Sequence, residues 1–273
     1  IVMISYKFDY KVAATLEEAF SMLEDAGNGG SFIAGGHSLV PAMKLRLAQP
    51  ETLIDISKVS GMSEISKDSG SLTIGGLVTH AEVASSELVK SICPGLSECA
   101  GLIGDAQVRN KGTIGGNIAH ADPGSDYPGA LIAFGAVIRL AGSSGVREVN
   151  AEDFFTGLFE TSKSDKEIVT GVIVPSYQYS TYVKFPNPAS RYAVVGVGVA
   201  LEMSGTKCES ISIGITGAAD HAFRARNSES LLSGSELTNN DLDSAISVVT
   251  EGQDMMSDLA ASSKYRSHLC GVM

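Results

Sequence analysis

Two short segments combine paired glycines with polar side chains, and these are the residues of the sequence best suited to chemistry. Residues 34–38 read Ala-Gly-Gly-His-Ser, and residues 113–117 read Thr-Ile-Gly-Gly-Asn. A residue without a Cβ atom lets its backbone N–H group come close to an anion, and small polar side chains add further donors. We therefore expect these segments, the first and second glycine motifs, to bind a pyrophosphate and the polyhydroxyl chain attached to it.

A third glycine pair, Gly75-Gly76, also follows an apolar strand. It continues into Leu77, Val78 and a capped helix, so we interpret it as structural. A glycine pair can serve solely to allow a positive φ in a tight turn, and this interpretation stays open for the other two pairs. Neither motif has the G-x-G-x-x-G pattern of a nicotinamide-binding unit or the lysine of a P-loop.

Other polar residues near the motifs do not form a recognisable catalytic or metal site. His37, His120 and Asp122 lack a familiar ligand spacing. Ser125, His120 and Asp126 have the residue types of a hydrolase triad, but no G-x-S-x-G elbow accompanies them. The four cysteines are scattered and do not have the spacings that an iron–sulfur cluster needs. We predict no catalytic residue and no metal ligand in this chain.

The composition argues against two classes of partner. The formal net charge is −11 and no cluster of Lys and Arg is present, which argues against a nucleic acid. No apolar run reaches the roughly 18 residues of a spanning helix, and the first residues do not read as a signal peptide. We therefore expect no transmembrane segment. Because the four cysteines are scattered and form no C-x-x-C pair, we also expect a reducing, cytoplasmic setting.

The first segment of the chain predicts a βαβ-like unit over residues 3–57. Thr15 and Glu18 form a capping-box pattern before a helix that ends at Gly27. The other expected elements are an alternating run at 5–10, strands at 31–34 and 52–56, and a short helix at 42–47 that follows Pro41.

The rest of the chain predicts two further units. In the second, Thr79 and Glu82 form another capping box, and the third begins near Tyr179. The second unit is expected to contain strands at 72–74, 136–140 and 171–175 and helices at about 96–102 and 129–134. The third is expected to contain strands at 181–185, 192–203 and 210–214, then helices at 239–252 and 258–269. Strands followed by helices argue for a separate α+β domain.

The two motifs with their flanks, residues 32–46 and 113–126, resemble the FAD-binding medium subunit of the molybdenum hydroxylases. That family includes the flavoprotein subunits of carbon monoxide dehydrogenase and xanthine dehydrogenase. The resemblance covers almost the whole chain. It implies an α+β fold in which two α/β subdomains, residues 1–57 and 58–176, clasp FAD in a PCMH-type FAD-binding fold. Residues 177–273 would form a C-terminal antiparallel sheet with helices, of the carbon monoxide dehydrogenase flavoprotein type.

The resemblance also implies a set of FAD contacts, with one glycine motif on each side of the pyrophosphate. Asp126 matches an aspartate that contacts the cofactor, Lys184 matches a lysine near the flavin ring, and Tyr192 is the candidate for an aromatic residue that shields one ring face. The full set is Phe32, Ile33, Ala34, Gly35, Gly36, His37, Ser38 and Leu39; Ile103, which would line the cleft; Thr113, Ile114, Gly115, Gly116 and Asn117; Asp126; Val169 or Thr170, for a backbone contact to the ring; and Lys184 and Tyr192.

Three of these assignments have a simpler alternative. Asp126 could cap a helix that starts near Tyr127. Lys184 could be a surface lysine of a strand, and Tyr192 could be ordinary core packing.

The resemblance implies an oxidoreductase subunit that does not bind the substrate itself. A large molybdenum-cofactor subunit would oxidise the substrate, and a small iron–sulfur subunit would pass electrons to FAD in this chain, which would pass them to an external acceptor. The assembly would be a heterotrimer. One alternative is a self-contained FAD oxidoreductase of the vanillyl-alcohol oxidase fold group, but the short last domain argues against it. Another is a flavin-free binding protein, against which the intact motifs, Asn117 and Asp126 argue.

Overall fold

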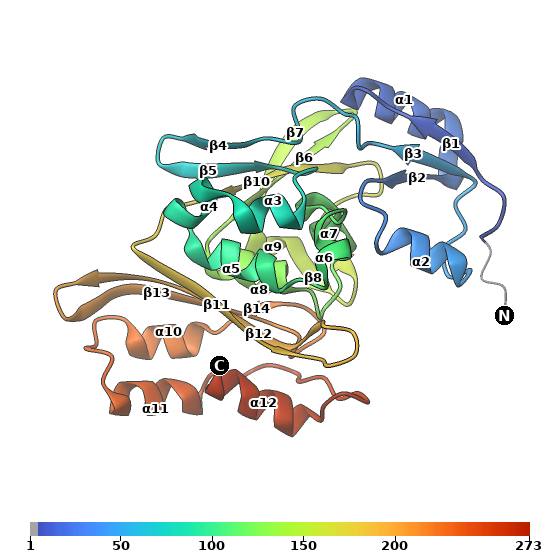
Figure 1. Cartoon of the computed structure of the whole chain (residues 1–273). Helices are drawn as coiled ribbons and strands as arrows, with labels where there is room; N and C mark the ends of the chain where they lie inside the picture. The colour runs from blue at the N-terminus through green and yellow to red at the C-terminus, as the bar shows by residue number, and fades with distance from the viewer. Residues whose placement is uncertain (1–4) are drawn as a thin grey trace.

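The computed structural model describes residues 5–273, which form three parts, each built on its own sheet (Figure 1). The first part has three parallel strands in the order β1-β3-β2, covered by α1. Its elements are β1 (Asp9–Val12), α1 (Leu16–Ala26), the 3-10 turn η1 (Gly27–Gly29), β2 (Gly30–Ile33), α2 (Leu39–Lys44) and β3 (Thr52–Asp55).

The cap predicted for α1 forms with one change. The Thr15 hydroxyl accepts the N–H of Glu18 at 3.2 Å, and the Glu18 carboxylate accepts the N–H of Ala14 at 2.8 Å instead of that of Thr15. The helix ends as predicted at Gly27, where φ is +56°. The short helix α2 begins at Leu39, earlier than expected, so Pro41 stands inside its first turn.

The alternating run predicted at residues 5–10 extends as a strand only from Asp9. Residue 3, where the predicted unit begins, lies outside the described residues.

The second part has a five-stranded antiparallel sheet in the order β4-β5-β10-β6-β7. The capping box predicted at Thr79 and Glu82 is present at the start of α3. The strands are β4 (Ile65–Asp68), β5 (Ser71–Gly75), β6 (Val137–Gly142), β7 (Gly145–Asn150) and β10 (Ile168–Val174), with a small hairpin of β8 (Phe155–Gly157) and β9 (Glu160–Thr161). The helices are α3 (His80–Ser85), α4 (Glu87–Ile92), α5 (Pro94–Leu102), α6 (Ala106–Arg109), α7 (Ile114–His120), α8 (Asp126–Ala133) and α9 (Ala151–Phe154).

The third part is an antiparallel sheet in the order β11-β12-β13-β14, followed by helices as predicted. Its elements are β11 (Tyr179–Pro186), β12 (Ala193–Ser204), β13 (Lys207–Thr216), β14 (Phe223–Arg224), α10 (Arg226–Leu232), α11 (Asn239–Ser247) and α12 (Ser263–Val272). The last helix begins later than expected because Asp258 holds a turn, accepting the N–H groups of Ala260 and Ala261. Its N-cap is Ser262, whose hydroxyl accepts the N–H of Tyr265.

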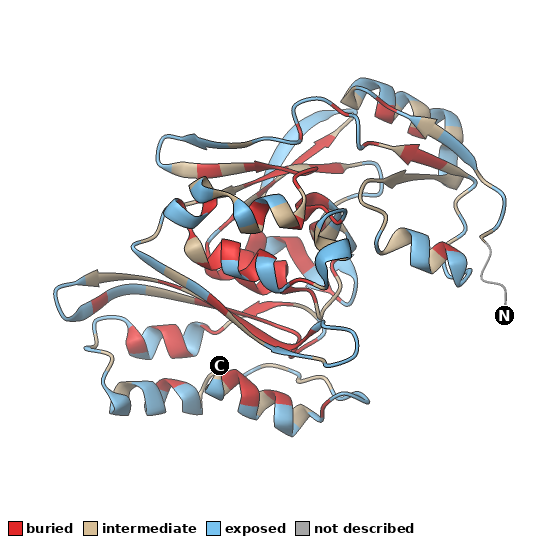
Figure 2. Ribbon diagram, in the orientation of Figure 1, coloured by how far each residue is buried: buried red, intermediate tan, exposed pale blue. Residues whose placement is uncertain are grey.

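The centre of the molecule is α8, which separates the second part from the third sheet. All of its residues are buried (Figure 2). It approaches the backbone of β12 and β13 so closely that a Cβ atom on Gly214 would lie 2.1 Å from the carbonyl oxygen of Gly129. The glycines of these two strands therefore let a helix pack directly on the sheet.

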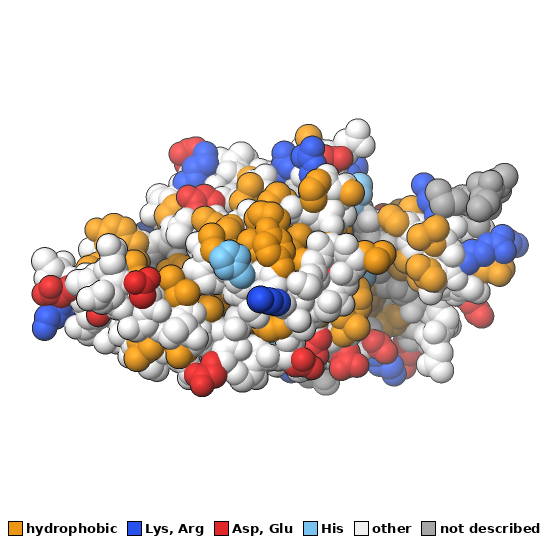
Figure 3. All heavy atoms as spheres, turned by 90° about the horizontal axis from the view of Figure 1, so that it is seen from below, with side chains coloured by type: hydrophobic (Ala, Val, Ile, Leu, Met, Phe, Trp, Pro, Cys, Tyr) orange, Lys and Arg blue, Asp and Glu red, His pale blue; other side chains and the backbone are white. Residues whose placement is uncertain are grey.

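The α+β fold class predicted from the sequence is confirmed. No helix within residues 5–273 is both long and apolar enough to cross a bilayer. On the face seen from below, basic and acidic side chains are scattered among groups of apolar ones, and no continuous basic stripe is visible (Figure 3).

Candidate functional site

A cleft of about 1550 Å³ lies between the first and second parts and contains both glycine motifs in its walls. At one end it reaches Tyr192, which precedes β12. At the other end it is lined by α1, by the turn between β6 and β7, and by the loop before β10. Pockets for compact ligands occupy about 300–1,000 Å³, so this cleft suits an extended ligand such as a dinucleotide.

The first glycine motif follows β2 and turns sharply into α2. Gly36 has a φ of +71°, a conformation that favours glycine. A Cβ atom on Gly35 would lie 2.2 Å from the carbonyl oxygen of Lys111, so glycine here lets the first motif touch the chain just before the second.

The backbone N–H groups of residues 35–38 donate no hydrogen bond to any other described residue. A run of unpaired N–H groups on the wall of a cleft is an anion-binding arrangement, because each N–H group needs an acceptor.

The second motif differs from the expectation of a turn after a strand. Gly115 and Gly116 belong to the first turn of α7, with Thr113 as the N-cap. The N–H of Gly116 donates to the Thr113 hydroxyl at 3.1 Å, and that of Gly115 donates to the carbonyl of Gly76 at 2.9 Å. The N–H groups of Ile114 and Asn117 also have protein acceptors, the carbonyls of Val78 and Thr113. The motif presents side chains to the cleft, including that of Asn117. The hydroxyl of Ser125, which also lines the cleft, donates to Oδ1 of Asn117 at 2.6 Å.

The glycine pair interpreted as structural packs backbone against backbone. A Cβ atom on Gly75 would lie 2.3 Å from the carbonyl oxygen of Met62, and one on Gly76 would lie 2.1 Å from that of Val169. The strand β10 bulges at Thr170, whose carbonyl accepts the N–H of Gly76 at 2.8 Å. Both positions need glycine because β5 lies so close to the backbone at Met62 and at β10 that a side chain would not fit. Gly76 also lines the cleft.

Asp126 and Lys184 meet in the interior at the Tyr192 end of the cleft. Lys184 Nζ lies 2.7 Å from Oδ2 of Asp126, and the Tyr182 hydroxyl donates to Oδ1 at 2.7 Å. Burial raises the pKa of Asp126, and the lysine opposes that shift. The Lys184 side chain is 2% exposed, so the surface-lysine alternative is wrong. Asp126 is the first residue of α8, but its carboxylate is engaged by β11 and makes no helix cap.

Tyr192 lies at the cleft end with 44% of its surface exposed, so the core-packing alternative for this residue is wrong. Its exposed ring is available to a ligand in the cleft.

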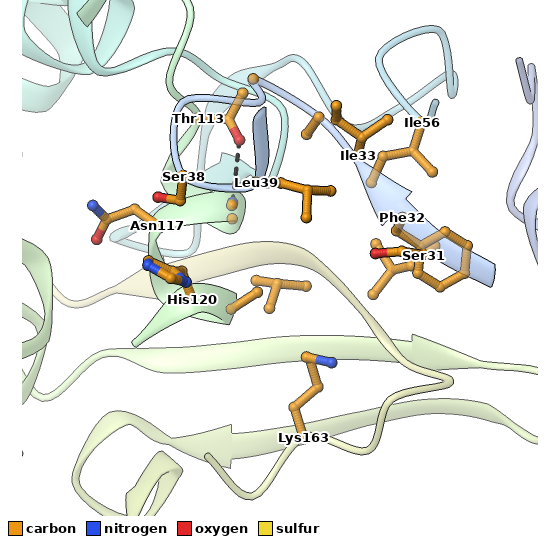
Figure 4. A pocket seen from close by; sticks show the side chains of 18 of the residues that line it. Ser31, Phe32, Ile33, Ser38, Leu39, Ile56, Thr113, Asn117, His120 and Lys163 are labelled. Carbon is orange, nitrogen blue, oxygen red and sulfur yellow. Dashed lines mark hydrogen bonds between the residues drawn. The ribbon is translucent and has the colours of Figure 1, made fainter. Parts of the chain in front are cut away.

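The structure brings most of the predicted set together on the cleft wall and leaves three residues off it. Those on the wall are Phe32, Ile33, Ala34, Gly35, Gly36, His37, Ser38, Leu39, Ile103, Thr113, Gly115, Gly116, Asn117, Asp126, Val169 and Tyr192. Ile114 is fully buried in the core of the second part. Thr170 donates its hydroxyl to the carbonyl of Arg139, and Lys184 lies behind Asp126. Figure 4 shows Ser38, Asn117 and His120 on one side of the cavity and Ile33 and Ile56 on another.

Sequence reasoning missed the wall that lies far from the motifs in the chain. It includes Gly142, Ser143, Gly145 and Val146 around the turn between β6 and β7, and Lys163 with residues 165–168 before and at the start of β10. These segments carry no motif, and tertiary folding alone brings them to the cleft.

One buried histidine supports the second motif from behind. A Cβ atom on Gly112 would lie 2.6 Å from Nε2 of His80, and the His80 ring centroid lies 5.4 Å from that of Tyr127. Burial, followed by the charges of His37 and Arg109, lowers the pKa of His80 to about 4. His80 is therefore neutral at physiological pH. Within residues 5–273, no cluster of three or more His, Cys, Asp or Glu is placed to hold a metal ion.

Comparison with known proteins gives matches along the whole chain. The family described as FAD binding domain in molybdopterin dehydrogenase matches residues 6–177, and the CO dehydrogenase flavoprotein C-terminal domain matches residues 180–273. The carbon monoxide dehydrogenase medium chain of Hydrogenophaga pseudoflava is 35% identical, over 99% of this chain and 96% of that protein. The glyceraldehyde dehydrogenase medium chain of Sulfolobus acidocaldarius is 36% identical, over 98% of this chain and 95% of that protein.

Two solved structures have the same fold over nearly the whole chain. A chain of carbon monoxide dehydrogenase from Hydrogenophaga pseudoflava, in a form lacking the Mo-pyranopterin moiety, superposes with a TM-score of 0.96, at 35% identity, covering 99% of this chain and 96% of that chain. A chain of quinoline 2-oxidoreductase from Pseudomonas putida 86 superposes with a TM-score of 0.93, at 31% identity, covering 99% of this chain and 95% of that chain.

Proposed function

Because this chain belongs to the family of FAD-binding medium subunits of the molybdenum hydroxylases, we propose that its cleft holds FAD and makes it the electron-transfer subunit of such a complex. The observation that carries this proposal is the run of unpaired N–H groups at residues 35–38 on the wall of a cleft of about 1550 Å³. These groups fit the diphosphate of a dinucleotide, which supplies the acceptors that residues 5–273 do not.

We assign the roles along the cleft from the groups that each part of the wall offers. Residues 35–38 bind the diphosphate through their amides, while Asn117 and Ser125 offer side-chain oxygens and an amide to the neighbouring hydroxyls. Tyr192 lies at the end nearest the third part, where its ring can cover a flavin. The opposite charges of Asp126 and Lys184 neutralise each other there, so this ion pair holds β11 against α8 without adding a net charge to the cleft wall.

We propose a division of the chain into three parts, each of which contributes to the cleft. Residues 1–57 supply the first motif, residues 58–176 supply the second motif and the opposite wall, and residues 177–273 supply Tyr192 and the support for Asp126.

FAD, when bound, supplies chemistry that side chains lack, since it accepts two electrons and can release them singly. The contribution of this chain is to bind and orient the cofactor. Electrons would arrive from the iron–sulfur clusters of a small partner subunit, after a large molybdenum-cofactor subunit has oxidised the substrate, and would leave to an external acceptor. The names of the relatives support this assembly, because those proteins are medium chains of dehydrogenases. We propose a heterotrimer.

We place this complex in the cytoplasm. The support is that all four cysteines are free and buried, without a disulfide, which suits a reducing compartment.

The test of the proposed function is a flavin titration of the purified full chain. After incubation with FAD and removal of the excess, we expect oxidised-flavin absorption bands and release of FAD by acid. A chain that retains no flavin would contradict the proposal. Co-expression with candidate partner genes should yield a complex that contains molybdenum and iron. Substrate turnover by the isolated chain would instead support the self-contained oxidoreductase.

A further inference from the structure

Lys163 points into the cleft from the loop between β9 and β10. Figure 4 shows its side chain rising into the cavity, across from Ser31 and Phe32 of β2. This loop and α1 line the end of the cleft that lies away from Tyr192, beyond the glycine motifs. Neither motif contains Lys163, and sequence reasoning gave it no role.

Among the described residues, 5–273, the ammonium group of Lys163 has no counter-ion. Its Nζ donates to the carbonyl of Ser164 at 2.8 Å, and within residues 5–273 no carboxylate oxygen lies within 4.0 Å of it. The neighbouring Glu167 is already engaged, because both of its oxygens bind Arg147, at 2.6 and 2.9 Å. The hydrogen bond to Arg147 is the largest cause that lowers the pKa of Glu167, to about 2. That carboxylate is therefore not available to Lys163.

The position of Lys163 is unfavourable for a cation unless a ligand compensates. The residue is half-buried, and burial lowers the pKa of its ammonium group while Asp165 and Glu167 act in the other direction. A partly desolvated charge without a counter-ion costs free energy, and an anion or further oxygen acceptors placed beside it reduce that cost.

From this geometry we propose that Lys163 binds the adenylate half of FAD, as a charged donor to its phosphate or ribose oxygens. The inference rests on the proposed function, which places the flavin ring near Tyr192 and the diphosphate at the first glycine motif. The adenylate half then extends toward the remaining end of the cleft, where the Lys163 side chain points into the cavity. The amides of residues 35–38 carry only partial charges, so a full positive charge at this end complements the dianionic dinucleotide.

The test compares ligands that contain the adenylate half with one that lacks it. FAD, ADP and FMN are titrated against the flavin-free full chain, ADP by its competition with FAD. In Lys163→Gln we expect the Kd for FAD and for ADP to rise about tenfold, while the Kd for FMN changes less than about twofold. Added salt should weaken ADP binding to the original chain more than to the variant. Lys163→Arg, which keeps the charge, should stay within about threefold of the original chain.

The matched control is Lys67→Gln, which removes the same charge from an exposed position in β4 away from the cleft. It should leave all three affinities unchanged, and thermal unfolding of each variant checks that the fold is kept. Unchanged FAD and ADP affinities in Lys163→Gln would overturn the inference while leaving the proposed function intact. Equal weakening of FMN would also overturn it, since the lysine would then act elsewhere. If the original chain binds no FAD, the proposed function itself fails.

Discussion

Lys184 and Asp126 form a buried ion pair that fastens β11 to the first turn of α8. The side chains are 2% and 4% exposed, and Nζ lies 2.7 Å from Oδ2. Tyr182, two residues before Lys184 on the same face of β11, donates to the other carboxylate oxygen. The lysine also donates to the carbonyl of Leu102 at the end of α5. One cluster therefore joins the third sheet to two helices of the second part, next to the cleft wall.

Breaking this pair from either side should destabilise the chain. Asp126→Ala leaves the lysine buried without a counter-ion, and Lys184→Met leaves the buried carboxylate without one. A buried ion pair that loses one member costs about 3–5 kcal/mol, so we expect the free energy of unfolding to fall by that amount in each variant. Urea denaturation followed by circular dichroism measures it.

The control for this prediction is the exposed pair of Glu87 and Lys90 in α4. Glu87→Ala should change the free energy of unfolding by less than about 1 kcal/mol, because exposed ion pairs contribute little. The double variant Asp126→Ala with Lys184→Met removes both charges, so its loss should be smaller than the sum of the single losses. Strictly additive losses would mean that the two side chains do not interact.

Gly35 should not tolerate even one added methyl group. In Gly35→Ala the new Cβ atom would meet the carbonyl of Lys111 at 2.2 Å, so the first motif must move away from the second. We expect FAD affinity to fall at least about tenfold, since the amides of residues 35–38 then leave their positions. The matched control is Gly101→Ala in α5, where the nearest atom would be 4.0 Å away. Equal FAD retention by both variants would show that the first motif does not bind FAD.

The sequence predicted best those elements whose signal is local. The caps of α1 and α3 and the first glycine motif depend on residues within a few positions of each other, and the structure contains all three. The second motif was expected to be a turn after a strand. It is instead the first turn of α7, because Thr113 caps a helix that is buried against the second sheet and so tolerates two glycines. Packing overrides the low helix propensity of glycine here.

The opposite wall of the cleft could not be predicted, because its residues meet only in the folded chain. Lys163 comes about fifty residues after the second motif and more than a hundred after the first, in a polar loop that resembles any exposed turn. The strands β4 and β7 were missed for a related reason, since most of their residues are exposed and show no apolar alternation. The role of Lys184 came only from family resemblance, and its burial beside Asp126 became visible only with the fold.

The four cysteines should be inert in the folded chain. Cys93, Cys99, Cys208 and Cys270 are all buried, and burial raises the pKa of each thiol, to about 11 for Cys93 and about 12 for Cys270. The thiolate is the reactive form, so both access and ionisation are suppressed. A thiol reagent with a coloured leaving group should therefore react slowly at pH 8 and consume four equivalents in denaturant. Fast reaction of any thiol in the native chain would show that the structure around that cysteine opens and exposes it to solvent.

His80 gives the stability of the chain a defined dependence on pH. The residue is 3% exposed, and its Nδ1 atom has no hydrogen-bond partner within the described residues. Its pKa is lowered from 6.5 to about 4, chiefly by burial. As the pH falls, the unfolded chain therefore binds a proton at this residue near pH 6.5, whereas the folded chain binds one only near pH 4. The stabilising contribution of the neutral ring is complete above pH 6.5 and is lost progressively as the pH falls to 4. The free energy of unfolding lost through this residue between pH 6.5 and 4 is about 3 kcal/mol.

Replacing His80 with leucine removes this titration and keeps an apolar group of similar size. The free energy of unfolding should therefore fall less steeply in His80→Leu than in the original chain between pH 6.5 and 4.5, and the two curves should run parallel above pH 7. Carboxylates also titrate in this range, but they do so equally in both proteins and cancel in the difference. Parallel curves for His80→Leu and the original chain down to pH 4.5 would show that the buried ring does not resist protonation.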